Sequence, residues 1–118
     1  MPSVTNESLA ETCEQYVGLL GHEDVASLMA LFAEDCVVED PVGSEPKSGK
    51  AEVQAFYATL PPVGVSAALT GPVRAVADGM SAAFPFKIET AGFEMEVIDV
   101  MTFDDDGKIT SMTAYWKM

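Results

Sequence analysis

The sequence is poor in the residues that carry most enzyme chemistry: among its 118 residues are one histidine, His22, one arginine, Arg74, and two cysteines. Two cysteines are too few for a disulfide scaffold, and no Cys/His cluster has the spacing of a zinc site. A site built on paired histidines cannot be assembled, and an Asp–Arg–Asp group would depend on Arg74 alone. We expect His22 to be solvated, so any acid–base chemistry must rest mainly on carboxylates and tyrosines.

Long apolar runs and positive charge are also lacking. No stretch approaches the roughly 20 consecutive apolar residues that a membrane-spanning helix needs. The first residues show no basic segment followed by an apolar run, which a secretory signal would have. Six basic residues against 19 acidic ones give a net charge of -13, which disfavours nucleic acids and anionic membranes as partners. We expect a cytoplasmic protein that binds a neutral or apolar small molecule.

Several sequence motifs of catalysis and metal binding are missing as well. There is no glycine-rich phosphate loop, no serine-nucleophile motif and no Cys–His pair. The run Asp104-Asp105-Asp106-Gly107 lacks the alternate-position ligands of a calcium loop, so it predicts a charged hairpin turn. Cys13 and Cys36 are interpreted as buried, reduced core residues rather than redox or metal groups. We therefore expect neither a metal nor an organic cofactor.

The chain has the length of one domain, residues 1–118, with a single hydrophobic core. Three stretches have the apolar spacing of amphipathic helices. They run from Leu9 to Leu20 before Gly21, from Val25 to Phe32 with Asp24 as N-cap, and from Val53 to Leu60 with Ser48 as N-cap and Pro61-Pro62 beyond the end. The first half of the chain is thus predicted to be mainly helical.

The second half is divided by turn signals into predicted strands. They cover residues 63–69, 73–77, 81–90, 93–103 and 108–116, after a short strand at 36–39. Consecutive strands joined by tight turns predict an antiparallel meander. The order of elements predicts an α+β domain, in which three N-terminal helices pack on a strongly curved, mostly antiparallel sheet and enclose a conical pocket.

Asp99 is the strongest single indication of chemistry. Because side chains alternate between the faces of a strand, Asp99 shares a face with Met95, Val97, Met101 and Phe103. Burial among apolar groups raises the pKa of a carboxyl and keeps it neutral, so that it can donate a hydrogen bond. The alternative is an aspartate at a sheet edge, or one paired with a buried backbone or hydroxyl group.

Tyr16, Tyr57 and Asp40 each fit two interpretations. Tyr16 lies within the apolar stripe of the first helix and Tyr57 faces inward from the third, so both are either core residues or members of a site in which they bond each other. Asp40 precedes Pro41, a pair typical of turns, and is either a solvated turn former or a carboxylate among neighbouring valines. Only the second setting would suit a proton-carrying group.

Five segments, in order, resemble the bacterial ketosteroid isomerases. They are Gln15-Tyr16-Val17, the loop Glu39-Asp40-Pro41-Val42-Gly43-Ser44-Glu45-Pro46 closed by Ser48-Gly49, Phe56-Tyr57-Ala58, Val97-Ile98-Asp99-Val100-Met101 and Ala114-Tyr115-Trp116. The resemblance extends from about Thr12 to Trp116. It implies the conical fold shared with nuclear transport factor 2, and a homodimer. Phe32 stands where some members carry a third tyrosine, and the turn at 90–92 looks shorter than in some relatives, so the tuning of the site stays open.

The resemblance also implies an activity and a role for each site residue. Members of this family are steroid Δ-isomerases, which convert 3-oxo-Δ5-steroids into conjugated 3-oxo-Δ4-steroids without a cofactor. Asp40 would carry the proton from C4 to C6, Tyr16 and a neutral Asp99 would stabilise the dienolate oxygen, Tyr57 would support Tyr16, and Trp116 would hold Asp40. The residues expected to contact the substrate, each equally compatible with plain core packing, are Leu20, Leu60, Val65, Phe86, Met112, Ala114 and Trp116.

Other functions remain open at this point. The same fold hosts hydrolases, dehydratases and cyclases. A non-catalytic binder of steroids or similar small apolar molecules would suit the acidic surface and apolar pocket equally well, although it would bury Asp40 and Asp99 without a use. A protein that only dimerises through an exposed sheet face is a third possibility.

Overall fold

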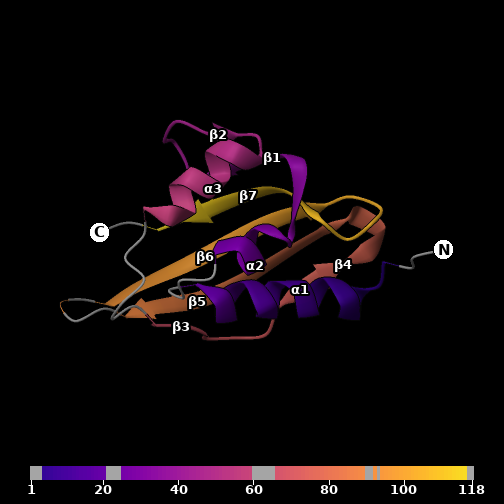
Figure 1. Ribbon diagram of the computed structural model, residues 1–118. Coiled ribbons are helices and arrows are strands. Elements are labelled where there is room, and N and C mark those ends of the chain that lie inside the picture. Colours follow the sequence, from indigo (N-terminus) through magenta and orange to yellow (C-terminus); the bar gives the residue numbers. More distant parts are fainter. Residues whose placement is uncertain (1–3, 21–24, 60–65, 90–91, 93, 117–118) are drawn as a thin grey trace.

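The computed structural model describes residues 4–20, 25–59, 66–89, 92 and 94–116. Three helices accompany one sheet of seven strands (Figure 1). The helices are α1 (Asn6–Leu19), α2 (Val25–Met29) and α3 (Lys50–Ala58), and a short 3-10 helix, η1 (Ala77–Gly79), precedes the fifth strand. The strands are β1 (Phe32–Glu39), β2 (Lys47–Ser48), β3 (Ser66–Leu69), β4 (Arg74–Val76), β5 (Ser81–Glu89), β6 (Glu94–Phe103) and β7 (Ile109–Tyr115). The domain is α+β, as predicted.

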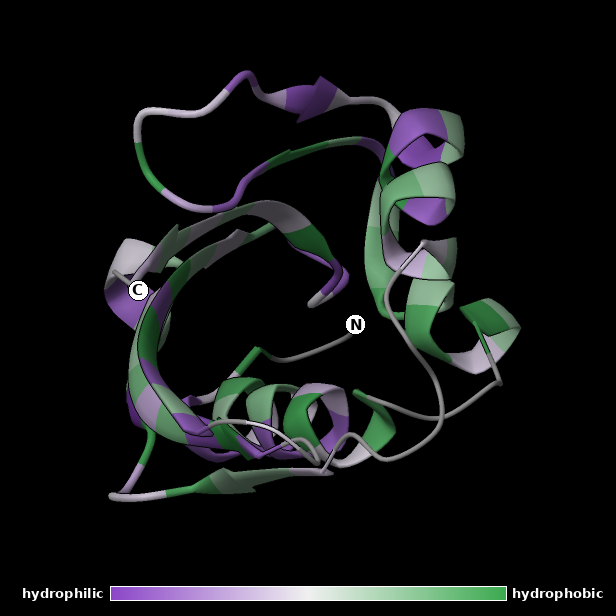
Figure 2. Ribbon diagram, turned by 90° about the vertical axis from the view of Figure 1, so that its left-hand side faces the viewer, coloured by the Kyte–Doolittle hydropathy of each residue, from purple (hydrophilic) through white to green (hydrophobic). Residues whose placement is uncertain are grey.

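The strand order is β2-β1-β7-β6-β5-β3, and β4 pairs with β5 as well. The antiparallel neighbours β5, β6 and β7 confirm the central part of the predicted meander. The prediction was wrong at one end, because β3 does not pair with β4, and β1, for which no pairing was predicted, joins β7 in parallel. Nine-residue β5 is long enough for both short strands: β4 pairs with 81–83 and β3 with 86–89. The result is a mixed, mostly antiparallel sheet that curls around its inner side, where α1 and α3 lie (Figure 2).

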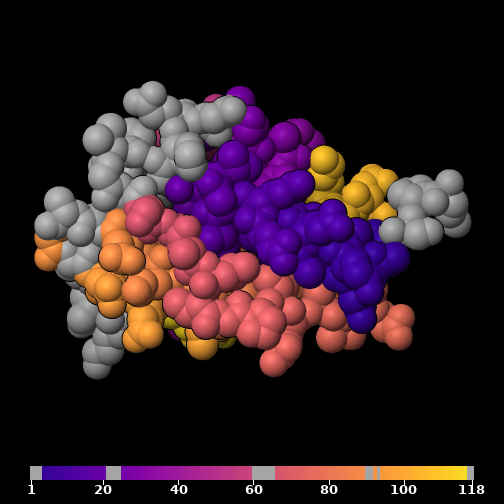
Figure 3. All heavy atoms as spheres, turned by 90° about the horizontal axis from the view of Figure 1, so that it is seen from below, coloured from indigo at the N-terminus to yellow at the C-terminus, as the bar shows by residue number. Residues whose placement is uncertain are grey.

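Helix α1 forms where the apolar spacing predicted a helix. Thr5 and Ser8 form a capping box, in which each side-chain oxygen accepts a hydrogen bond from the other residue's backbone N–H. The predicted stripe from Leu9 through Tyr16 is buried, and the helix ends at Leu19. Figure 3 shows α1 lying across one face of the molecule beside β3 and β4. Its buried stripe thereby reaches the inner side of the curled sheet.

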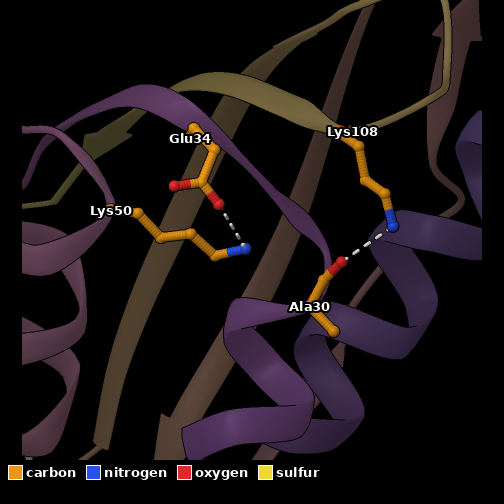
Figure 4. Close-up of polar contacts among 4 residues, drawn as sticks. All are labelled: Ala30, Glu34, Lys50 and Lys108. Carbon is orange, nitrogen blue, oxygen red and sulfur yellow. Dashed lines mark hydrogen bonds and ion pairs between the residues drawn. The ribbon is translucent and has the colours of Figure 1, made fainter.

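The second predicted helix was too long and the first predicted strand too short. Phe32 begins β1, opposite Ile109 of β7, instead of ending α2. A short apolar run such as 28–32 fits a helix end or a buried strand, so its period cannot decide between them. Polar contacts hold this junction: Lys108 Nζ donates to the Ala30 carbonyl at 2.9 Å, and Lys50 lies 3.6 Å from the Glu34 carboxylate (Figure 4).

The start of α3 also differs from the prediction. Its N-cap is Gly49, with φ of 89° and no side-chain cap, while Ser48 lies in β2 and donates its backbone N–H to Glu52 Oε1. A positive φ suits glycine, and it turns the chain from β2 into the helix. Of the other predicted boundaries, Gly21, Asp24 and Pro61-Pro62 lie outside the described residues, as does His22.

The core lies between the helices and the inner face of the sheet. Cys13 and Cys36 are both buried and free, as expected. The run from Asp104 to Asp106 forms the turn between β6 and β7, with Asp104 Oδ1 accepting from the backbone of Asp106 and Lys108. In the part of the chain that the structure describes, no helix has the length and apolar character needed to cross a membrane.

Candidate functional site

A cavity of about 190 Å³ lies between α1, α3 and the inner face of β5 and β6. Most of its lining is apolar, and its polar groups are four ionisable side chains and one indole. The lining residues are Tyr16, Leu20, Asp40, Phe56, Tyr57, Phe86, Ile88, Met95, Val97, Asp99 and Trp116. The structure thus brings together all five residues for which the sequence suggested a catalytic or supporting position.

Asp99 lies deep in this cavity, with 1% of its surface exposed. The predicted alternation is confirmed, because the buried side chains of β6 are on the face of Asp99 and its neighbours on the other face are exposed or only partly buried. Neither carboxyl oxygen has a hydrogen-bond partner among the described residues. Burial, and secondarily the negative charge of Asp40, raise the pKa of Asp99 well above its usual value. A neutral acid with a free donor hydrogen is therefore the expected state at neutral pH.

The two tyrosines form one hydrogen-bonded pair. The hydroxyl oxygens of Tyr16 and Tyr57 are 2.7 Å apart, and their rings meet edge to face. Burial is the largest cause that raises the pKa of both phenols well above the usual value, so both stay protonated. Two hydroxyls carry two hydrogens and their mutual bond uses one, which leaves one donor for the cavity. Phe32 packs against both rings but adds no hydroxyl, so the chain of phenols ends at two.

Asp40 directly follows β1 and is only partly buried. Trp116 donates its indole N–H to Asp40 Oδ1 at 2.5 Å. Burial raises the pKa of Asp40, and the bond from Trp116 lowers it. A second contact fixes the same loop, because the Val42 backbone N–H donates to the Ala114 carbonyl at 2.8 Å. Asp40 is therefore a held carboxyl at the wall of an apolar cavity, rather than a freely solvated turn residue.

Only some of the residues that were expected to line the cavity do so. Leu20, Phe86 and Trp116 line the cavity, whereas Met112 and Ala114 are buried without lining it, which corrects that expectation. Met112 is the cross-strand partner of Met101, a fully buried core residue. Ala114 is the small residue directly opposite Asp99. Leu60 and Val65 lie outside the described residues.

Four lining residues were not predicted to contact a ligand: Phe56, Ile88, Met95 and Val97. A signal was present for two of them, since Met95 and Val97 share the inner face of β6 with Asp99. Ile88 is the cross-strand partner of Met95, which only the observed register reveals.

Chemically, the cavity joins a carboxyl able to take up a proton with neutral donors in an apolar wall. Arg74 is exposed on β4 and does not line the cavity, so an Asp–Arg–Asp group is not formed there. Among the residues described, no group of three or more histidine, cysteine or acidic side chains is gathered as for a metal ion. The arrangement suits proton removal next to a ketone and stabilisation of the oxyanion that results.

Comparisons with known proteins agree with the fold. The chain is 44% identical over 106 residues to a Steroid Delta-isomerase of Nocardioides simplex, covering 86% of this chain and 84% of that protein. A solved structure of the epoxide hydrolase/cyclase-like enzyme SalBIII, which is linked to pyran ring formation in the polyether salinomycin, superimposes with a TM-score of 0.83 and 26% identity, covering 95% of this chain and 92% of that one. The model of the SnoaL-like domain matches residues 13–112. The chain therefore belongs to the SnoaL-like family, within the nuclear transport factor 2-like superfamily.

Proposed function

We propose that this protein is a steroid Δ-isomerase that converts 3-oxo-Δ5-steroids into 3-oxo-Δ4-steroids. The observation that carries the proposal is the buried Asp99 carboxyl, unpartnered within the described chain, in an apolar cavity shared with Tyr16 and Asp40. Leaving a buried polar group without a partner costs about 1–3 kcal/mol, which a ligand oxygen would recover. The 44% identity to the curated isomerase supports the same reaction.

Asp40 is the proton carrier in this proposal. Its carboxylate removes a proton from C4, next to the ketone, and the electron pair of the C–H bond forms a dienolate. The same carboxyl, now protonated, returns the proton to C6, which gives the conjugated enone. Because one group serves both carbons, it must be held but not locked, and the single indole bond from Trp116 suits this requirement.

Tyr16 and Asp99 stabilise the negative charge that develops on the ketone oxygen. Both remain protonated for the same reason, burial, and both line the cavity. Donors fixed before the reaction need little reorganisation, which is why one such donor is typically worth about 100-fold or more in rate. Tyr57 keeps the Tyr16 hydroxyl in place through their mutual bond.

The apolar wall of the cavity suits an apolar substrate such as a steroid. Beyond Asp99, the inner face of β6 continues through Val97 to Met95 as an apolar part of the lining. The four residue steps from Asp99 to Met95 span roughly 13 Å, which is comparable to the length of four fused rings. On β5, Phe86 lies opposite Val97 and Ile88 lies opposite Met95, and both extend the same apolar wall.

The test is to mix the purified protein with 5-androstene-3,17-dione and to follow the ultraviolet absorbance of the conjugated enone. We expect a fast rise that Asp40→Asn abolishes, because an amide cannot take up the C4 proton. Tyr16→Phe and Asp99→Leu should each lose at least about 100-fold in turnover. Binding of the steroid without a rise would point to a non-catalytic binder, and near-normal turnover of both variants would refute the oxyanion assignment.

A cytoplasmic location and a homodimer are parts of this proposal. The two cysteines are free and buried, as is common for proteins of reducing compartments.

A further inference from the structure

The two proposed oxyanion donors come from different elements and share no hydrogen bond. Tyr16 belongs to α1 and Asp99 to β6, and the Asp99 oxygens have no hydrogen-bond partner in the described part of the chain. Both side chains are buried, with 2% and 1% of their surface exposed. Because no polar contact links the two groups, the distance between the hydroxyl and the carboxyl depends on the side chains packed against both.

One buried phenylalanine, Phe84 of β5, lies against both donors. Phe84 is the cross-strand partner of Asp99, and the Cβ atoms of directly opposite residues are roughly 5 Å apart. Its ring also meets the ring of Tyr16 edge to face, with centroids 6.3 Å apart and an interplanar angle of 67°. Phe84 therefore lies between the helix and the strand that carry the two donors.

The other rings packed around Tyr16 do not have this position. Phe32 packs on Tyr16 and Tyr57, so it supports the pair of tyrosines, and its strand, β1, does not pair with β6. Tyr57 lines the cavity itself and bonds the Tyr16 hydroxyl. Of the three described rings in contact with Tyr16, Phe84 is the one that also lies opposite Asp99.

Phe84 is fixed in place by its own neighbours and lies behind the cavity wall. It has 1% of its surface exposed, and it is not among the described residues that line the cavity. Its ring packs against Phe86, the next inward-facing side chain of β5, with centroids 5.8 Å apart, and Ala82 on its other side is buried as well. A side chain in this place acts on a bound ligand only through the residues that it touches.

We infer that Phe84 is a positioning residue that sets the spacing between the Tyr16 hydroxyl and the Asp99 carboxyl. Two donors stabilise one oxygen only if both reach it, and a displacement of about 1 Å can cost about 100-fold in rate. A smaller side chain at this position would leave space behind both donors, into which they would relax, while the surface that contacts the ligand would keep its residues. The effect on turnover rests on the proposed function, whereas the spacing of the donors does not.

The first experiment compares Phe84→Leu with Phe103→Leu, a matched control. Phe103 is also buried on the inner face of β6, but it is not among the described residues that line the cavity. With 5-androstene-3,17-dione, we expect kcat of Phe84→Leu to fall at least about tenfold and KM to change less than about threefold, because the ring does not contact the substrate. Both constants of the control should stay within about twofold of the wild type, although each variant loses the same ring from the core.

The second experiment measures the donors without turnover. In the proposed reaction the ligand oxygen is negative while Asp40 is protonated, so Asp40→Asn reproduces the neutral base. The probe is 4-nitrophenol, whose yellow phenolate carries its charge on one oxygen and is distinguished from the phenol by absorbance. Adding Phe84→Leu to Asp40→Asn should weaken binding of the phenolate at least about tenfold, whereas adding Phe103→Leu should change it less than about twofold.

The outcomes separate the inference from the proposed function. Equal effects of the Phe84 and Phe103 variants on kcat and on phenolate binding would overturn the inference, as would a rise in KM at unchanged kcat, which would assign the ring to substrate binding. A wild type without turnover, whose phenolate binding still depends on Phe84, would count against the proposed function alone. Should Phe84→Leu fail to fold by circular dichroism, Phe84→Met, whose flexible side chain fills the space less rigidly, makes the same test with an expected loss of at least about threefold.

Discussion

Replacing Asp99 by asparagine tests the neutral, buried carboxyl through stability rather than activity. Asparagine has almost the same shape but cannot ionise. Because burial raises the pKa of Asp99 well above that of an unfolded chain, the folded wild type binds one proton more than the unfolded chain over the intervening pH range. The variant lacks this proton uptake, so the two proteins must differ in how stability depends on pH.

The change of stability with pH is set by the difference in bound protons between the folded and unfolded states, and this gives the sign and size of the effect. A raised pKa in the folded state contributes stability that is fully present below the unfolded pKa of about 3.9 and is lost as pH rises through the folded value. Above pH ~4, the wild type should therefore lose about 1.4 kcal/mol per pH unit relative to Asp99→Asn, until the folded Asp99 ionises. Asp40 is present in both proteins, so its own raised pKa largely cancels in the comparison.

Urea unfolding at intervals of half a pH unit, from pH 4 to pH 8 and at one protein concentration, measures this slope. The matched control is Asp78→Asn, which makes the same substitution at an exposed position of η1, outside the cavity. The comparison relies on slopes, because the amide creates its own constant cost in the apolar cavity. If the difference between wild type and Asp99→Asn were flat over this range, Asp99 would not be held neutral by burial, and its assigned role as a donor would fall with it.

Three further predictions concern the surroundings of the site. Trp116→Phe removes the bond that lowers the pKa of Asp40, so the acid limb of kcat/KM should move to higher pH, and an unmoved limb would contradict the role of the indole. The thiol of Cys13, whose pKa is raised to about 12 mainly by burial, and the equally buried Cys36 should resist iodoacetamide at pH 8 until urea unfolds the chain, and fast labelling of the native protein would show that they are accessible. Met101→Ala, at a fully buried position of β6, should lower the free energy of unfolding by about 2–5 kcal/mol in a urea titration, and a loss below 1 kcal/mol would mean that the core there can collapse.

Local patterns predicted those parts of the fold in which one period dominates. The helical spacing from Leu9 to Tyr16 and the strand alternation around Asp99 both gave the correct buried face. The junction at Phe32 was mispredicted because five apolar residues fit two periods equally well. The cap at Gly49 was missed because its conformation depends on β2, a two-residue strand with no sequence pattern of its own. Patterns of one element cannot reveal where short elements pair.

The site was predictable in its members but not in its assembly. Asp99 could be singled out from its own strand, whereas Tyr16 and Tyr57 looked like ordinary core residues, and 41 positions separate them in the chain. Their mutual bond depends on how α1 and α3 approach the sheet, a tertiary arrangement that spacing does not encode. The resemblance to the ketosteroid isomerases supplied what the residues alone left open. The cavity walls show the remaining limit, because Met112 and Ala114 share the predicted strand of Trp116 but lie in the core.

The parallel pairing of β1 with β7, which the sequence did not predict, brings the proposed base and its indole partner together. Because β1 runs parallel to β7, the carboxyl-terminal ends of the two strands lie side by side at the same end of the sheet. Asp40 follows the end of β1 and Trp116 follows the end of β7, so the parallel register brings the indole to the carboxylate. In an antiparallel pairing Asp40 would lie at the opposite end of seven-residue β7, roughly 23 Å away. The parallel pairing of β1 and β7 therefore places the proposed base at the wall of the cavity.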